Sequence, residues 1–178
     1  MKTRRVVTGQ DAAGRTIFLS DGEAPNSHEF RSVPGFVTTL AWTTRPDDGP
    51  RMSLDDPTDG AVSWLPPKGG THLMVITFPP DSVMMSPDFD PATAGAEYVA
   101  TMPDLAQRFE AEAPGMHQTD TVDYGVVLSG QIVLDLGNDQ TRTLGRGDII
   151  VQNATRHAWR NPFDQPATLA FVLIDTGA

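Results

Sequence analysis

The feature that most constrains the fold is a recurrence of short β-patterned runs separated by glycine-containing turns. From Val122 to the C-terminus such runs return about every eight to twelve residues. Within Gln131–Leu136 the apolar side chains alternate, and Gly137-Asn138-Asp139 follows as a turn. The chain has 16 glycines and 15 prolines in 178 residues, which disfavours a helical bundle. This pattern is typical of an antiparallel sandwich or barrel.

Strand patterns also occupy the N-terminal half, so we expect extra strands ahead of that barrel core. The runs Thr16–Ser20, Phe36–Thr44 and Thr71–Phe78 are rich in β-branched and aromatic residues. Residues 92–110 have the best helical spacing in the chain, interrupted by Pro103, and predict one or two short helices. No shift in composition marks a boundary, so we expect a single domain, 1–178.

Charge and cysteine content exclude several classes of function. The net charge is −10, so nucleic-acid backbones and anionic membranes would be repelled, and we expect neither as a partner. The chain has no cysteine, which excludes disulfides, thiol nucleophiles and thiolate metal sites. The absence of cysteine, of a signal peptide and of any long apolar run leads us to expect a cytoplasmic protein.

Two segments carry residues suited to site chemistry. The first is Gly115-x-His117-x-Thr119-x₃-Asp123-x₆-Gly130. The second opens at Gly147-Asp148 and leads to His157, with Asn161 four positions further on. One hairpin fits between the two segments, so an antiparallel fold can bring them together. On other interpretations, His117 is a surface residue, His157 packs beside Trp159, and Asp123 is a turn or edge residue.

The two segments together resemble the conserved motifs of the cupin family. Those motifs read G-x₅-H-x-H-x₃₋₄-E-x₆-G and G-x₅-P-x-G-x₂-H-x₃-N. In this register His117 matches the first histidine, Asp123 the glutamate, His157 the histidine of the second motif and Asn161 its asparagine. The resemblance covers about residues 110–175, which would form the motif-bearing core of the barrel.

This chain departs from the family pattern at three positions. Thr119 stands in place of the second histidine, and Gln152 and Ala154 stand in place of the proline and glycine of the second motif. The resemblance nevertheless implies an all-β, antiparallel jelly-roll barrel, a homodimer, and a divalent transition metal (Fe, Mn, Ni or Zn) inside the barrel.

The resemblance assigns His117, Asp123 and His157 as the metal ligands. Two imidazoles and a carboxylate suit non-haem iron, or zinc completed by water. Residues 117, 119, 121 and 123 have the same parity, so they can share one face of an extended strand. Four further residues are candidates for lining the pocket: Thr119, Tyr124, Gln152 and Asn161.

Three functions follow as hypotheses. The first is a metal-dependent enzyme acting on a small organic molecule inside the barrel, of the oxygenase, decarboxylase or lyase, or isomerase or cyclase class. The second is a metal-free cupin that binds or senses a small molecule. The third is a metal-independent, epimerase-like enzyme in which a histidine is the base and Tyr124 the acid.

Overall fold

The structure is a computed structural model that describes residues 2–48, 55–60 and 62–177. Over these residues the chain forms eleven strands, two α-helices and one short 3₁₀ helix, η1 (Asp81–Val83). The strands are β1 (Arg4–Gln10), β2 (Thr16–Glu23), β3 (Asn26–Glu29), β4 (Val37–Thr44), β5 (Thr71–Phe78), β6 (Thr121–Ser129), β7 (Gln131–Asp135), β8 (Thr141–Gly145), β9 (Ile149–Asn153), β10 (Ala158–Arg160) and β11 (Ala167–Asp175).

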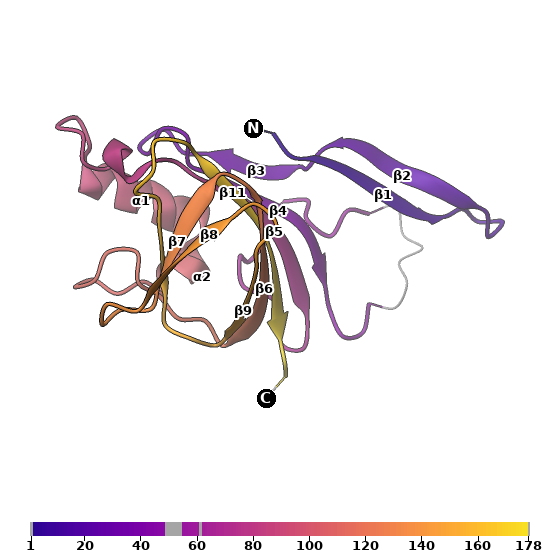
Figure 1. Ribbon diagram of the computed structural model, residues 1–178. Helices are drawn as coiled ribbons and strands as arrows, with labels where there is room; N and C mark the ends of the chain where they lie inside the picture. The colour runs from indigo at the N-terminus through magenta and orange to yellow at the C-terminus, as the bar shows by residue number, and fades with distance from the viewer. Residues whose placement is uncertain (1, 49–54, 61, 178) are drawn as a thin grey trace.

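The strands assemble into two facing sheets and a separate hairpin, as Figure 1 shows. The large sheet has the order β3-β4-β5-β11-β6-β9, and the smaller one β10-β7-β8. Neighbouring strands are antiparallel throughout. Strands that are neighbours in the sheets are often far apart in the sequence, which is the arrangement expected of a jelly roll. The all-β, antiparallel jelly-roll prediction is therefore confirmed. Of the predicted N-terminal strands, Phe36–Thr44 and Thr71–Phe78 correspond to β4 and β5 of the large sheet, and Thr16–Ser20 lies in the separate β1–β2 hairpin.

Strand β6 shows why the sequence pattern places particular side chains inside. Its residues alternate between buried and outward-facing, so that Asp123 and Val127 point into the barrel while Tyr124 and Leu128 point out. The turn after β6 requires glycine, because Gly130 has φ +74° and a Cβ there would lie 2.4 Å from the carbonyl oxygen of Pro166.

The two α-helices lie at one end of the barrel (Figure 1). Helix α1 (Pro91–Thr101) begins at Asp90, whose side chain accepts a hydrogen bond from the backbone N–H of Ala92 at 3.0 Å. Helix α2 (Pro103–Ala106) follows directly, because Pro103 cannot continue the first helix. The predicted pair of short helices is thus confirmed. Among the described residues, no helix has the length and apolarity needed to cross a membrane.

Candidate functional site

The two motif histidines lie side by side, on loops that precede β6 and β10. Their backbones are joined in both directions: the N–H of each donates to the carbonyl of the other at 2.9 Å. The centroids of the two imidazole rings are 4.2 Å apart. Segments 40 residues apart in sequence are thereby joined at one point, and the structure brings His117 and His157 together as the sequence predicted.

Hydrogen bonds to the backbone fix which nitrogen of each imidazole carries the proton. Nδ1 of His117 lies 3.1 Å from the carbonyl oxygen of Gly115, and Nδ1 of His157 lies 2.8 Å from that of Thr155. A carbonyl oxygen only accepts, so each Nδ1 must be the protonated nitrogen that donates. Each neutral ring therefore keeps an unprotonated Nε2 with a free lone pair.

Burial keeps both imidazoles neutral. It lowers the pKa of His117, and burial together with the neighbouring His117 lowers the pKa of His157 to about 4. A positive charge on either ring would lose hydration and face a second imidazole. At neutral pH the site therefore presents two unprotonated nitrogens rather than an imidazolium.

A short polar chain lies on the inner face of β6 and on the loop just before it. The hydroxyl of Thr121 donates to Asp123 Oδ1 at 2.6 Å and lies 2.9 Å from the hydroxyl of Thr119. All three side chains are buried, and burial raises the pKa of Asp123. Gln152 is the cross-strand neighbour of Asp123 on β9, and its buried Nε2 has no hydrogen-bond partner among the described residues. Gln152 thus faces the interior with unused hydrogen-bonding capacity.

Two of the predicted pocket residues lie elsewhere. Tyr124 is 48% exposed on the outer face of β6, because adjacent residues of a strand point to opposite sides and Asp123 points in. Asn161 is buried, but its side chain bonds three backbone groups, the carbonyls of Phe78 and Gln165 and the N–H of Phe163. Asn161 therefore holds a loop rather than facing the histidines.

A small cavity of about 60 Å³ opens beside the histidine pair inside the barrel. Its polar lining is His117, Thr119, Asp123, His157 and Tyr98. The rest of the lining is apolar or aromatic: Phe36, Met74, Ile76, Phe78, Leu105, Trp159, Phe171 and Leu173. The cavity therefore combines five polar side chains with an otherwise apolar lining.

Sequence reasoning missed an aromatic pair, Phe109 and Tyr98, that packs beside His117. Phe109 stacks on His117 with ring centroids 4.5 Å apart, and Tyr98 packs edge-on against Phe109 at 5.2 Å. Burial raises the pKa of Tyr98, so its phenol stays protonated. Tyr98 lies on α1 and Phe109 follows α2; only their position inside the expected helical segment could have indicated them.

A larger hollow, of about 650 Å³, lies away from this chamber. It is lined by prolines and by His72 and Asp104, and His72 is separated from Asp123 by Leu173 on the intervening strand. The histidine pair does not line it. We therefore place the candidate site at the small cavity, where both motif histidines converge.

The donor set fits a metal only in part. The two Nε2 lone pairs are suitable ligands, and an Nδ1–H held by a backbone carbonyl is the usual arrangement behind a metal-bound histidine. However, in the part of the chain that the structure describes, no three His, Asp or Glu side chains form a group that could hold a metal ion. Asp123 is bonded to Thr121 instead, so the predicted three-residue metal site is not assembled in this structure.

The fold and the paired histidines define a jelly-roll protein with a small internal cavity beside two histidines, and comparison with known proteins gives its family. The family model described as "Cupin domain" matches residues 107–174. The chain is 36% identical over 174 residues to the cupin-domain-containing oxidoreductase fogC of Aspergillus ruber, covering 96% of this chain and 71% of that protein. The chain belongs to the cupin family.

A second sequence relative is also similar over most of this chain, whereas the match to a solved structure is weak. The chain is 32% identical over 160 residues to the phomopsin biosynthesis cluster protein C' of Diaporthe leptostromiformis, covering 88% of this chain and 69% of that protein. A Cupin 2 conserved barrel domain protein from Salinispora arenicola matches in structure with a TM-score of 0.36 and 13% identity, over 59% of this chain and 63% of that one. The family assignment rests on the sequence relatives.

Proposed function

We propose that the protein is a cupin-type enzyme that acts on a small, largely apolar organic molecule inside the barrel. The observation that carries this proposal is the pair of neutral imidazoles, each with its Nε2 lone pair free, beside an apolar cavity. Relatives support the enzyme class, since one is named an oxidoreductase and another belongs to a biosynthesis cluster.

The walls of the cavity support this substrate class. Aromatic and aliphatic side chains bind apolar carbon skeletons, while the few polar groups on one side orient a single polar function. The cavity of about 60 Å³ has room for roughly two water molecules, so binding must displace wall side chains. Tyr98 and Leu105 come from the two helices at this end of the barrel, and a shift of those helices would enlarge the chamber.

In the reaction we propose, His117 is the base. An acidic O–H, or a C–H next to a carbonyl, donates its proton to Nε2 of His117, and the electron pair stays on the substrate as an enolate or alkoxide. His157 has the more strongly lowered pKa, so it is the weaker base and accepts a hydrogen bond instead. The protonated phenol of Tyr98, which lines the same cavity, is the acid that we assign to protonate the substrate anion.

This assignment replaces the tyrosine that the sequence indicated. Tyr124 cannot donate a proton inside the barrel, because it lies on the outer face of β6. Tyr98 lines the cavity and carries the same functional group. The acid–base form of the enzyme therefore matches the hypothesis of a metal-independent, epimerase-like enzyme, with Tyr98 instead of Tyr124 as the acid.

A metal-dependent form is the second candidate, favoured by the two Nδ1–H bonds to backbone carbonyls. A divalent transition metal (Fe, Mn, Ni or Zn) would bind Nε2 of both histidines, and Asp123 would have to leave Thr121 to join them. When bound, such a metal would act as a Lewis acid or oxygen activator.

Hydrogen exchange from solvent tests the acid–base proposal directly. A panel of small aromatic and aliphatic carbonyl compounds is incubated in D₂O with protein in chelator, and deuterium at the carbon next to the carbonyl is followed by mass spectrometry. Wild type is expected to catalyse uptake into at least one compound, His117→Gln to lose it, and Tyr124→Phe to retain it. Equal uptake with His117→Gln would remove His117 as the base.

Metal content separates the two forms. The apoprotein is reconstituted separately with Fe²⁺, Mn²⁺, Ni²⁺ and Zn²⁺, desalted and assayed by elemental analysis, with His117→Ala and His157→Ala as controls. About one metal per chain in wild type, lost in both variants, supports the metal-dependent form. Equally negligible metal in all three proteins removes it. Stabilisation by a small molecule without turnover would instead assign a binding role.

A further inference from the structure

The larger hollow, of about 650 Å³, is not used by the reaction proposed above. The end of β4, the start of β5, the loop between these strands and helix α2 all contribute to its lining. Its volume is typical of a pocket that binds a small molecule. The apolar part of the lining comes from the loop: Pro57, Val62, Leu65, Pro66 and Pro67. Proline fixes φ, so this part of the wall resists collapse.

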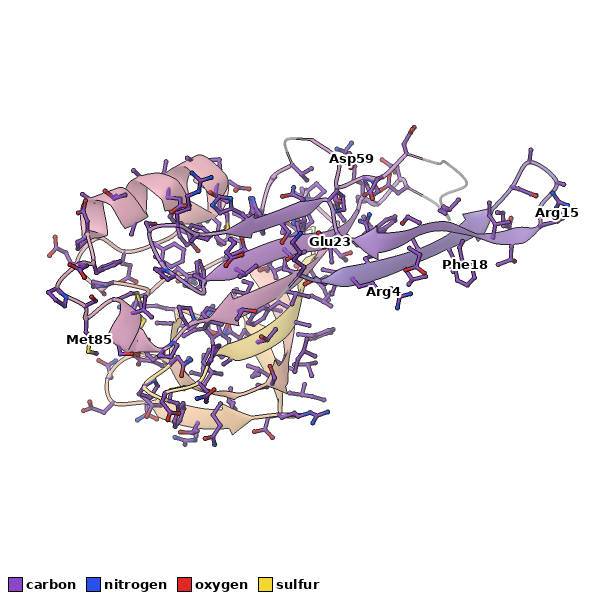
Figure 2. The ribbon with its side chains drawn as sticks, turned by 90° about the horizontal axis from the view of Figure 1, so that it is seen from above. Arg4, Arg15, Phe18, Glu23, Asp59 and Met85 are labelled. Carbon is purple, nitrogen blue, oxygen red and sulfur yellow. The ribbon has the colours of Figure 1, made fainter. Side chains whose placement is uncertain are left out.

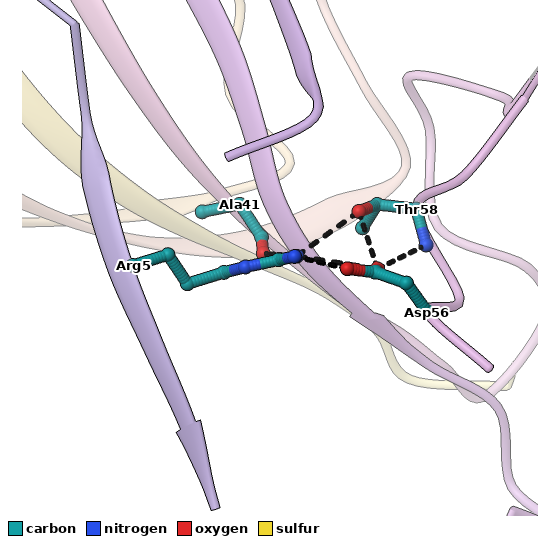
Figure 3. Close-up of polar contacts among 4 residues, drawn as sticks. All are labelled: Arg5, Ala41, Asp56 and Thr58. Carbon is teal, nitrogen blue, oxygen red and sulfur yellow. Dashed lines mark hydrogen bonds and ion pairs between the residues drawn. The ribbon is translucent and has the colours of Figure 1, made fainter. Parts of the chain in front are cut away.

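The loop between β4 and β5 is anchored on one side by Arg5 of the β1–β2 hairpin, as Figure 3 shows. The Arg5 guanidinium donates to the Ala41 carbonyl oxygen at 3.0 Å and to Thr58 Oγ1 at 3.1 Å, and it pairs with the carboxylate of Asp56. The Arg5 side chain is only 12% exposed. Asp59, the next residue of the loop, lies at the surface near the base of the hairpin (Figure 2). The hairpin therefore holds this part of the wall in place.

Helix α2 anchors the other side of the loop through Asp104. Its Oδ2 accepts hydrogen bonds from the N–H groups of Trp64 at 2.7 Å and Leu65 at 3.0 Å, and from the hydroxyl of Ser63. Its Oδ1 accepts one from the N–H of Leu105 at 2.9 Å. Burial would raise the pKa of Asp104, but the hydrogen bonds lower it overall, so the side chain is a carboxylate at neutral pH. The hollow is thus held on two sides before any ligand binds.

His72 forms the part of the lining that belongs to β5. Its neighbours on the adjacent strands are Thr43 and Leu173, and it is only 1% exposed. Burial lowers the pKa of His72, so the ring is neutral. A hydrogen bond to the backbone of Trp64 acts in the opposite direction. A bond that favours the protonated ring is one that the ring donates, so His72 donates its proton to the Trp64 backbone.

The Nδ1 atom of His72 has no hydrogen-bond partner among the described residues. A neutral imidazole has a single N–H, and the bond to Trp64 uses it, so Nδ1 carries a lone pair. A buried acceptor without a donor destabilises the fold. A ligand that brings an N–H or O–H group to this end of the hollow would remove that cost.

The charges around the hollow distinguish between possible donors. Among the described residues of its lining, Asp59 and Asp104 are acidic and Arg45 is basic. The charge of Asp104 acts on His72, so this carboxylate lies close to the ring. An ammonium group would donate to Nδ1 and also be attracted by Asp104. A hydroxyl would satisfy the lone pair alone, and an anionic group would be repelled by Asp104.

A metal ion fits the hollow less well than an organic cation. Within the ranges that the structure describes, no three His, Asp or Glu side chains form a group that could hold a metal. The carboxylate of Asp104 already accepts from four donors of the chain. The apolar wall of the loop, in addition, offers a surface for a carbon skeleton.

We propose that this hollow is a second ligand-binding site, which takes the protonated amino group of a small organic amine with an apolar body. The ammonium donates to Nδ1 of His72 and lies beside the carboxylate of Asp104. The apolar body packs against the prolines of the loop. The histidine pair of the catalytic proposal takes no part, because neither His117 nor His157 lines the hollow.

Arg45 separates two sources of such an amine. It is exposed in the lining of the hollow, two residues beyond Thr43, which is the cross-strand neighbour of His72. Its guanidinium can bind a carboxylate on the same ligand. The shared chemistry is an ammonium group on an apolar body, carried by a simple amine or by an amino acid.

Isothermal titration calorimetry of the full-length protein tests the site, with 2-phenylethylamine as the probe. Two analogues, 2-phenylethanol and 3-phenylpropionate, keep the ring and its two-carbon spacer but replace the ammonium by a hydroxyl or a carboxylate. The amine should bind at least about tenfold more tightly than either analogue, because neither analogue can make the charge-assisted contact.

Variants test the residues assigned to the ammonium. His72→Phe removes Nδ1, and Asp104→Asn removes the charge but keeps an oxygen for the loop; each should weaken amine binding by about tenfold or more. Asp120→Asn is the matched control, because it removes the same charge from a side chain that is 77% exposed and outside the hollow. Both Asp120→Asn and His117→Gln should bind the amine as wild type does. The result is therefore independent of the proposed reaction.

Nitrogen-15 NMR of histidine-labelled protein tests where the amine binds. The Nδ1 resonance of His72 is identified by its absence from the spectrum of His72→Phe. It should shift on addition of 2-phenylethylamine, because its lone pair then accepts a hydrogen bond. The resonances of His117 and His157 should not move.

L-Phenylalanine distinguishes the two sources of the ammonium group. Tighter binding of L-phenylalanine than of 2-phenylethylamine, with the advantage lost in Arg45→Met, identifies an amino acid. Equal or weaker binding of L-phenylalanine identifies a simple amine. Either result supports the ammonium site.

Three outcomes overturn the proposal. The first is a wild type that does not bind 2-phenylethylamine, and the second is an alcohol analogue that binds as tightly as the amine. The third is unchanged amine affinity in a His72→Phe or Asp104→Asn variant that is folded by circular dichroism.

Discussion

Replacing His157 by glutamine should reduce the loss of folding stability that occurs as the pH falls from 7 to 4. The unfolded chain takes up a proton at this histidine as pH falls through about 6.5, whereas the folded chain resists until about 4. Between those values the unfolded state binds more protons, so stability falls as pH falls. A difference of about 2.5 pH units corresponds to about 3 kcal/mol.

Other groups also change their protonation between pH 4 and 7, but their contributions to stability are the same in wild type and in the variant. The raised pKa of Asp123 acts in the opposite direction, since the stabilisation it gives is present at low pH and lost as pH rises through its folded value. Asp123 is present in both proteins, so it contributes equally. Burial, and not His157, lowers the pKa of His117, so this contribution too is the same in both proteins.

Urea denaturation at several pH values between 7 and 4, with a chelator present, measures the effect. The free energy of unfolding of wild type should fall by about 3 kcal/mol more than that of His157→Gln over this range. The m-values should stay equal, so that the change is one of stability and not of compactness. Parallel pH curves for the two proteins would show that burial does not hold His157 neutral, and would refute the reasoning.

Three further predictions concern the backbone and are measured by urea denaturation at neutral pH. Ala154→Gly should raise the free energy of unfolding by about 0.5 kcal/mol, because Ala154 has φ 51° and glycine relieves more backbone strain there than it costs in conformational entropy. A lower free energy of unfolding would show that the turn is unstrained. Asn161→Ala should cost about 3 kcal/mol through three lost backbone partners, against a change near zero for exposed Asn153→Ala. Gly130→Ala should cost at least about 2 kcal/mol, while Gly145→Ala, with open space around it, should be nearly neutral; equal effects would contradict the steric argument.

The sequence predicted the fold because strand alternation is a local property. On β6 the two-residue period alone places Asp123 inside, and applied consistently it places Tyr124 outside. The same period therefore places the Tyr124 side chain outside the cavity. The motif register was sufficient to pair His117 with His157, since the spacing of two motifs around one hairpin carries long-range information.

The cavity walls were not predictable in the same way. Tyr98 reaches the chamber only because α1 packs across the end of the barrel, and no local pattern specifies that docking. The direction of the Asp123 carboxylate depends on Thr121, a neighbour whose hydroxyl competes with any ligand. Ala154 is a second example of what the sequence did not predict. It occupies the position of the family's glycine, and its backbone is in the left-handed region although it is not a glycine.

The reciprocal backbone bonds between His117 and His157 have a consequence for how such a chain can change over time. Because each amide is satisfied by the other loop, an insertion in the segment before β6 would displace the imidazole that precedes β10 as well. The two loops should therefore accept new lengths only together. Anyone who transplants one of them into another barrel would have to move its counterpart in the same step.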